Sequence, residues 1–381
     1  MTATLEKYVT LGRSGLRVSA LCLGTMTFGT DWSFGVEEKF ARAIFDRYID
    51  AGGNFVDTAD GYTNGTSEQQ VGKFIRERNL RDRVALATKF TFNTEPGNPN
   101  AGGNGRKNIY RALEGSLRRL QTDYVDLYWL HAWDTVTPVE EVVSTLNDLV
   151  REGKIRYYGF SDTPAWYLSR AHTLAEKDGQ EPLIALQLEY SLTERNIDRE
   201  HIPAAQEMGM AVCPWGSLAS GFLSGKYQGQ GNTGSGEGRL AIVKGHPAFD
   251  KFSPRNWTIL EALRDVSKQM NRPPAQVAQN WALTQPGITS IIIGATKVSH
   301  VEDSLAATEF SIPAELRQRL DKASDLEPTH PYVFYGGMLQ QRISGGTSVA
   351  AWVPARATGA SVMPEGEPIN FSPQKKASTA D

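Results

Sequence analysis

The chain has 381 residues, of which 40% are hydrophobic and 22% are charged, so it can bury a core without disulfide or metal staples. Its 40 Lys and Arg residues stand against 43 Asp and Glu residues, which leaves no cationic excess for a nucleic-acid backbone. The amino terminus lacks the apolar core of a signal peptide, and no run approaches the roughly 18 to 20 apolar residues of a membrane span. Both cysteines, Cys22 and Cys213, lie in apolar runs. We therefore predict a cytoplasmic protein with buried thiols and with neither nucleic acid nor membrane as a partner.

In chain order, the first predicted element is a short hairpin over 8–11 and 16–19. Short apolar runs then alternate with longer segments that carry apolar residues at helical spacing. The predicted strands are 20–23, 54–57, 84–88, 124–130, 155–160, 183–188, 211–213 and 290–293, and the predicted helices include 36–51, 67–77, 107–121, 138–151 and 164–177. This alternation predicts parallel strands joined by right-handed crossovers. Eight such units favour a closed (β/α)8 barrel, although an open doubly wound sheet would produce similar local patterns.

One segment that departs from the alternation is 228–238, which is rich in Gly, Ser and Asn. Residues 229–234 match the G-x-G-x-x-G pattern of dinucleotide-binding folds. No predicted strand leads into the pattern and no helix opens from it, which a true fingerprint requires. We therefore predict a flexible lid or insertion here.

The second departure is the carboxyl-terminal stretch, which has little periodicity. It divides the chain into a barrel over 1–328 and an extension over 329–381. The extension carries Tyr332, Phe334, Tyr335 and Trp352 and the apolar run 349–353, although disordered linkers are usually poor in aromatic residues. We therefore expect the extension to pack against the rest of the protein.

Four polar residues fall at or just after successive predicted strands. Asp57 ends the second strand, Tyr62 lies in the loop that follows it, Lys89 follows the third strand and His131 follows the fourth. In a barrel the carboxyl ends of the strands meet at one mouth, where active sites of this architecture lie. Each residue alone has an ordinary explanation, such as a helix cap, a solvated strand end or a core histidine. Four together favour an active site.

The motifs around these residues resemble the aldo-keto reductase family. They are FVDTADGY at 55–62, ATKF at 87–90, DYVDLYWLH at 123–131, GKIRYYGFS at 153–161 and LQLEYS at 186–191. The resemblance covers residues 8–325. It implies a barrel that reduces an aldehyde or ketone with a nicotinamide cofactor, or catalyses the reverse oxidation.

The resemblance assigns a role to each of the four residues. Hydride delivery to a carbonyl carbon leaves an alkoxide, so a proton donor must lie within about 3 Å of the oxygen. Tyr62 would be that donor, and Lys89 is expected to lower its pKa from the ordinary value near 10. Asp57 would hold the Lys89 ammonium in place while cancelling part of the effect of its charge on Tyr62. His131 would orient the substrate carbonyl.

The resemblance also names cofactor contacts. Ser161, Asp162 and Gln187 match positions that bind the nicotinamide carboxamide, although asparagine is commoner than Asp162, and Trp215 matches the aromatic that stacks on the ring. The other matched positions are Thr25, Met26 and Asp57, the pyrophosphate loop of Gly216, Leu218, Ser220, Gly221 and Lys226, and the adenosine segment of Gly294, Thr296, Lys297, His300 and Ser304. Because Thr296 stands where arginine is frequent, a 2′-phosphate would depend on Lys297 at a helix amino terminus. We expect NADP(H), with NAD(H) as the alternative, and no metal.

Aromatic residues near the predicted mouth suggest an apolar or aromatic small-molecule substrate. They are Phe28, Trp32, Trp129 and Trp133. In the family the chain leaving the last helix passes over the mouth, so 332–335 are expected to cover the pocket, with packing against outer helices or a partner subunit as the alternative. The same barrel also occurs in potassium-channel auxiliary subunits, which gives a non-enzymatic interaction protein as the rival hypothesis. The direction of the reaction and the oligomeric state are left open, and a homo-oligomer is compatible with the sequence.

Overall fold

A computed structural model describes residues 4–242, 250–335 and 342–347 of the chain. Eight strands form one sheet in the order β12-β3-β4-β5-β6-β7-β8-β9, and every pair in it is parallel. The bounds are β3 (Leu21–Gly24), β4 (Phe55–Asp57), β5 (Ala85–Phe90), β6 (Val125–Leu130), β7 (Ile155–Ser161), β8 (Ala185–Gln187), β9 (Ala211–Val212) and β12 (Ile291–Gly294). The sheet closes where the Thr289 N–H donates to the Val212 carbonyl (2.9 Å) and the Ile292 N–H to the Pro214 carbonyl (2.8 Å). The predicted (β/α)8 barrel is confirmed.

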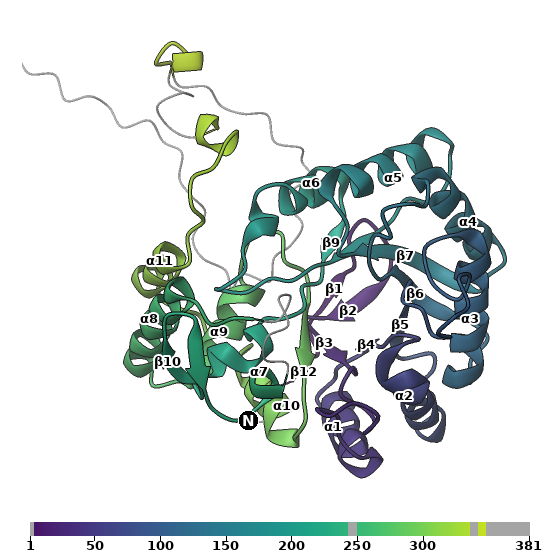
Figure 1. Cartoon of the computed structure of the whole chain (residues 1–381), viewed down its shortest axis with the longest axis horizontal. Coiled ribbons are helices and arrows are strands. Elements are labelled where there is room, and N and C mark those ends of the chain that lie inside the picture. The colour runs from purple at the N-terminus through teal and green to yellow at the C-terminus, as the bar shows by residue number, and fades with distance from the viewer. Residues whose placement is uncertain (1–3, 243–249, 336–341, 348–381) are drawn as a thin grey trace, which may run out of the picture.

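Helices surround the sheet on the outside (Figure 1). They are α1 (Glu38–Asp50), α2 (Thr66–Glu77), α3 (Arg106–Leu120), α4 (Val139–Arg151), α5 (Ala165–Lys177), α6 (His201–Met208), α7 (Arg239–Ile242), α8 (Pro254–Met270), α9 (Pro274–Leu283), α10 (Val298–Ala306) and α11 (Ala314–Ala323). In α4 the buried residues Val142, Leu146 and Leu149 recur at helical spacing and face the sheet, as the sequence pattern predicts. The helix predicted to start at residue 36 begins at Glu38, because the Val36 main chain is paired with Thr27 and Gly29.

Buried side chains fill the interior of the barrel at the end opposite the mouth. The hairpin of β1 (Tyr8–Thr10) and β2 (Arg17–Ser19) is formed as predicted, and its buried residues join the interior cluster at that end. Both cysteines lie in this cluster as fully buried free thiols, and burial raises the pKa of each well above its ordinary value. They are therefore poor nucleophiles, which confirms the expectation of buried thiols.

The segment predicted as a flexible lid or insertion is an insertion after β9, and it forms an antiparallel hairpin rather than an irregular loop. Its strands are β10 (Gln228–Gln230) and β11 (Thr233–Ser235). The hairpin packs on the rings of Phe252 and Trp257, which are stacked 5.6 Å apart, and the Trp257 indole N–H donates to the Gly231 carbonyl (3.1 Å). A Cβ at Gly234 would lie 2.5 Å from the Phe252 ring. The glycines therefore allow close packing of the hairpin on aromatic rings.

The extension leaves α11 and rises beyond the ring of helices (Figure 1). The Tyr332 hydroxyl donates to the Glu200 carboxylate (2.6 Å), and the Arg199 guanidinium lies 5.2 Å from the Tyr332 ring. Both partners directly precede α6, and the side chains of residues 333–335 are 45 to 63% exposed. The contacts of Tyr332 agree with the alternative of packing near an outer helix, and the expectation that 332–335 cover the pocket stays a prediction. Trp352 and the run 349–353 lie outside the described residues.

Within the described ranges, no helix combines the length and the apolar character that a bilayer crossing needs.

Candidate active site

The barrel brings the four predicted catalytic residues together at the carboxyl ends of β4, β5 and β6. The Lys89 ammonium donates to the Asp57 carboxylate, to the Tyr62 hydroxyl (3.0 Å) and to the Thr58 carbonyl (2.9 Å). The His131 ring lies edge-on to the Tyr62 ring with the centroids 5.7 Å apart. Lys89 and Asp57 are almost fully buried, whereas Tyr62 and His131 are half-buried. The two charged groups therefore lie beneath the two that a substrate can reach.

The electrostatics of Lys89 and Tyr62 follow from this burial. Burial alone would lower the pKa of Lys89, but the contacts with Asp57 and Tyr62 outweigh it and raise that pKa. Lys89 is therefore a permanent cation. For Tyr62, burial raises the pKa more than Lys89 lowers it, and Asp57 raises it further. Lys89 lowers the pKa of Tyr62 as expected, but that pKa stays above its ordinary value, because the loss of hydration of the phenolate exceeds the gain from Lys89.

His131 is a neutral imidazole in this site. Burial and the nearby Lys89 charge hold its pKa well below the ordinary value. Its Nδ1 is buried and has no hydrogen-bond partner in the described structure. A neutral ring can donate from one nitrogen without bringing a second positive charge toward Lys89.

Buried hydroxyl groups hold the loop that carries Asp57 and Tyr62. The Thr25 hydroxyl donates to the Asp57 carbonyl (3.0 Å) and lies 2.8 Å from the Ser67 hydroxyl, which is 2.9 Å from that of Thr58. Thr25 was expected to contact the cofactor, but it is fully buried and its side chain supports this loop instead.

Asp162 and Trp215 lie together at the ends of β7 and β9. The Trp215 indole N–H donates to the Asp162 carboxylate (3.3 Å), and the Ser161 hydroxyl lies within 3.4 Å of the same carboxylate. Asp162 has a left-handed backbone (φ 45°), which asparagine and aspartate tolerate better than most residues. Loss of hydration raises its pKa to about 6. The Gln187 amide, expected near the cofactor, donates to Asp57 (3.2 Å).

The segment expected to bind pyrophosphate forms a turn of successive left-handed residues. Ala219, Ser220 and Gly221 have φ values of 49°, 56° and 90°. Turns of this kind direct main-chain N–H groups into a concave surface that can bind an anion. Gly216 and Leu218 lie immediately before the turn.

Three groups predicted to meet phosphates lie close together in space although they are far apart in sequence. Burial lowers the pKa of Lys226, and the charge of Lys297 lowers it further. Burial and then the charges of Lys297 and Lys226 lower the pKa of His300. Lys297 is the N-cap residue of α10, where helix N–H groups also favour an anion. This cluster matches the charge of a phosphate group.

The other residues of the adenosine segment differ in accessibility. Gly294 is exposed at the end of β12, and the Thr296 N–H donates to the His300 ring (3.3 Å). Ser304 is buried, and its hydroxyl donates to the His300 carbonyl (2.9 Å). Ser304 therefore supports the turn rather than facing the surface.

A family profile described as the aldo/keto reductase family matches residues 20–325, which is most of the chain. The chain belongs to the aldo/keto reductase family. An aryl-alcohol dehydrogenase of Pestalotiopsis microspora is 34% identical to this aldo/keto reductase over 336 residues, 86% of this chain and 85% of the relative. A norsolorinic acid reductase of Aspergillus flavus is 33% identical over 367 residues, 93% of this chain and 91% of the relative. An NADP(+) aryl-alcohol dehydrogenase of Phanerodontia chrysosporium is 32% identical, with 84% and 86% covered. The chain is therefore an oxidoreductase.

Two of the four aromatic residues predicted to line the substrate pocket of this aldo/keto reductase lie in the core, which corrects the prediction. Phe28 is fully buried with its ring 6.3 Å from that of Phe74. Trp129 fills the barrel interior beside Gly159, where a Cβ would lie 2.4 Å from the indole. Trp32 does reach the site, with its ring edge-on to Tyr62 at 6.2 Å.

Trp133, the fourth of these residues, is half-buried after β6. Its ring lies edge-on to that of Trp166, with the centroids 5.6 Å apart, and packs against Tyr167 at 6.0 Å. Trp133 therefore belongs to an aromatic cluster at the start of α5.

Sequence reasoning missed two residues at the mouth. Phe92 is 53% exposed, and its ring lies edge-on to His131 with the centroids 4.7 Å apart. Its position three residues after Lys89 could have indicated it. The Arg239 guanidinium lies 4.8 Å from the Phe34 ring and 3.9 Å from the Met26 sulfur, so it brings a cation to the side of the mouth where Met26 lies. The sequence around Arg239 shows neither helical nor strand periodicity of apolar residues, so no pattern indicated this residue.

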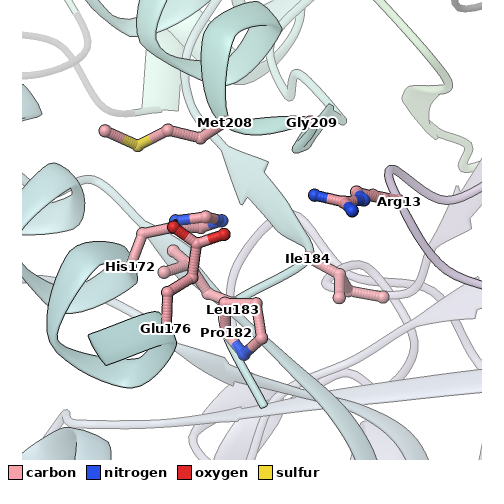
Figure 2. Close-up of a pocket in the computed structure, with 8 residues that line it drawn as sticks. All are labelled: Arg13, His172, Glu176, Pro182, Leu183, Ile184, Met208 and Gly209. Carbon is pink, nitrogen blue, oxygen red and sulfur yellow. The ribbon is translucent and has the colours of Figure 1, made fainter. Parts of the chain in front are cut away.

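A separate cavity of about 260 Å³ lies at the opposite end of the barrel. Figure 2 shows Arg13 facing His172 and Glu176 across it. Its other lining residues precede β8 and β9 or end α6, and they are Pro182, Leu183, Ile184, Met208 and Gly209. No predicted site residue lines this cavity.

Proposed function

We propose that this aldo/keto reductase interconverts an aromatic carbonyl compound and its alcohol with NADP(H), using Tyr62 as the proton donor for reduction. The observation that carries the proposal is the 3.0 Å contact between the Tyr62 hydroxyl and the buried Lys89 ammonium. A permanent cation at this distance stabilises the phenolate that remains after proton donation.

In the proposed mechanism the bound nicotinamide supplies the hydride. Tyr62 donates its proton to the carbonyl oxygen as negative charge develops there, and Lys89 stabilises the resulting phenolate. Asp57 holds the Lys89 ammonium in line, and His131 donates a hydrogen bond to the substrate oxygen while it stays neutral. The same residues serve alcohol oxidation in reverse, with the Tyr62 phenolate accepting the proton.

Two lysines support NADP(H) over NAD(H). Lys226 and Lys297 lie close together at the amino end of α10 beside His300, where a 2′-phosphate adds charge that NAD(H) lacks. The left-handed turn at 219–221 would hold the pyrophosphate, and Trp215, which is half-buried, would stack on the nicotinamide. One of the relatives is named as an NADP(+) enzyme.

Two aromatic rings flank the catalytic pair and support an aromatic substrate. Trp32 lies against Tyr62, and Phe92 lies against His131. A planar ring whose carbonyl lies between Tyr62 and His131 would contact aromatic side chains there. Relatives named for aryl alcohols and for norsolorinic acid agree with this choice of substrate.

The test is cofactor oxidation, followed by absorbance, with a panel of aromatic and aliphatic aldehydes and with each cofactor in turn. We expect turnover of aromatic aldehydes with NADPH, and loss of that turnover in Tyr62→Phe. Tight cofactor binding with no turnover of any carbonyl or alcohol in the panel would instead favour the non-enzymatic interaction protein.

A further inference from the structure

Asp60 is a buried carboxyl group without a hydrogen-bond partner. It is 4% exposed, and neither side-chain oxygen meets a donor in the described structure. Its main chain is fixed, because the Asp60 N–H donates to the Lys89 carbonyl (3.1 Å). Buried polar groups in folded proteins are almost always hydrogen-bonded, so an orphaned carboxyl two residues from Tyr62 requires an explanation.

The neighbouring carboxyl group of Glu68 on α2, unlike that of Asp60, meets two donors. Glu68 is fully buried, and its oxygens accept from the Thr88 hydroxyl (2.5 Å) and from the Arg119 guanidinium (2.6 Å). Two neighbouring carboxyl groups cannot both ionise cheaply in one interior, and the one without donors keeps its proton.

The charges around Asp60 come from three elements. Burial and then the Glu68 charge raise the pKa of Asp60 to about 7. Arg119 and Arg111 on α3 oppose this rise, as does the nearby Gly61 N–H, which does not reach hydrogen-bond geometry with the carboxyl group. On β6, burial and then the charges of Asp60 and Glu68 raise the pKa of Tyr128.

We propose that Asp60 works as a neutral carboxylic acid that positions Tyr62, and that loss of its proton displaces the turn over 60–62 and limits turnover at alkaline pH. The proposal rests on the proposed function, because it takes Tyr62 as the proton donor. An ionised Asp60 would lie unpaired beside the Glu68 carboxylate, and it can escape only by turning toward water. Asp60 and Tyr62 are joined through Gly61, so this movement breaks the 3.0 Å contact between Tyr62 and Lys89.

The sign of the stability effect follows from linkage. An aspartate in the unfolded chain ionises near pH 3.9, whereas folded Asp60 keeps its proton to about pH 7. The folded state binds more protons between these values, so stability falls as pH rises through this window and then stays constant. Ionisation of Asp60 is therefore expected to lower both the free energy of unfolding and the turnover.

The test compares the wild type with Asp60→Asn, which fixes a neutral group of the same shape. Asp126→Asn is the matched control. Asp126 pairs with Arg81 (2.8 Å) at the amino end of β6, which is the end away from the mouth. Melting temperature and turnover are measured from about pH 5 to 9. We expect the Asp60→Asn protein to melt above the wild type by a margin that grows toward pH 7. Wild-type turnover should fall about tenfold per pH unit above a midpoint near pH 7. We call this decline the alkaline limb of the pH–turnover curve. It should be absent in Asp60→Asn and present in Asp126→Asn.

A second variant keeps the test decisive if Asp60→Asn does not fold. Glu68→Gln removes the neighbouring charge, which should lower the Asp60 pKa and move the alkaline limb to lower pH. If neither the alkaline limb nor the melting profile changes in Asp60→Asn, the whole proposal is overturned. If the melting profile changes but the alkaline limb does not, Asp60 is neutral in the folded protein and does not position Tyr62. Absence of any carbonyl turnover in the wild type instead overturns the proposed function, and the melting profile still decides whether Asp60 is neutral.

Discussion

The Lys89 ammonium lies between the Tyr62 hydroxyl and the Asp57 carboxylate, so one buried cation serves both groups. The contact with Asp57 raises the pKa of Lys89 and keeps the charge in place, while the contact at 3.0 Å directs that charge at Tyr62, the proposed proton donor. Asp57 also cancels part of the field at Tyr62, whose pKa stays above its ordinary value. Tyr62 is therefore protonated at neutral pH, the form that carbonyl reduction requires.

Replacement of Tyr62 by phenylalanine removes only the hydroxyl, so it tests proton donation directly. We expect Tyr62→Phe to lower turnover by about 10² to 10⁴ while cofactor affinity stays within about a few-fold. Steady-state kinetics and cofactor titration by fluorescence measure the two effects. Retention of most of the turnover would remove Tyr62 from the mechanism.

Replacement of Lys89 by methionine removes the charge and keeps the length of the side chain. We expect lower turnover and a higher Tyr62 pKa, because Lys89 lowers that pKa. Ultraviolet titration of each variant in an Asp60→Asn background, against its Tyr62→Phe counterpart, isolates the ionisation of Tyr62 without the displacement proposed above pH 7. Asp57→Asn should shift the Tyr62 pKa in the opposite direction, and equal shifts in both variants would show that Lys89 only holds the loop.

Cofactor choice is tested at Lys297. We expect Lys297→Ala to weaken NADPH binding by about 1 to 3 kcal/mol and to leave NADH binding nearly unchanged, because only NADPH carries the 2′-phosphate. Binding of NADPH to the wild type should also weaken with added salt. Lys39→Ala on α1, which removes an exposed lysine that is paired with Glu37, is the control. Equal affinity of the wild type for both cofactors would contradict the NADP(H) assignment.

Phe92 is the residue through which we expect ring-shaped substrates to be selected. Phe92→Ala should lower kcat/KM for a planar aromatic aldehyde by roughly fivefold to tenfold, in line with about 1 kcal/mol for a lost aromatic contact, and should change cyclohexanecarbaldehyde reduction much less. Phe40→Ala removes a phenylalanine that is 50% exposed on α1 and serves as the control. Equal losses for both aldehydes would indicate that Phe92 only supports His131.

The sequence by itself predicted the barrel and brought together the four residues that we propose as the catalytic group. Alternating strands and helices require parallel pairing, and parallel strands bring their carboxyl ends to one mouth whatever the packing detail. Asp57, Lys89 and His131 could therefore be placed together from their positions at strand ends. The hydrogen bonds of Lys89 confirm that Asp57 and Tyr62 meet there.

Only the tertiary structure decided which aromatic rings face the mouth, because the direction of a ring depends on space left by distant residues. Trp129 turns inward where Gly159 leaves room for its indole, and Phe28 is buried against Phe74, whereas Trp32 and Phe92 stay at the surface. The hairpin of β10 and β11 likewise depends on the stacked rings that follow it in the chain.

The state of Asp60 was also beyond the sequence. Local sequence shows only an aspartate between a strand and a tyrosine. In the folded barrel Thr88 and Arg119, which are 28 and 59 positions further along the chain, donate to Glu68, whereas neither side-chain oxygen of Asp60 meets a donor. Hydrogen-bond donors are shared out among buried carboxyl groups only when the elements pack, so the protonation of Asp60 is a property of the assembled barrel.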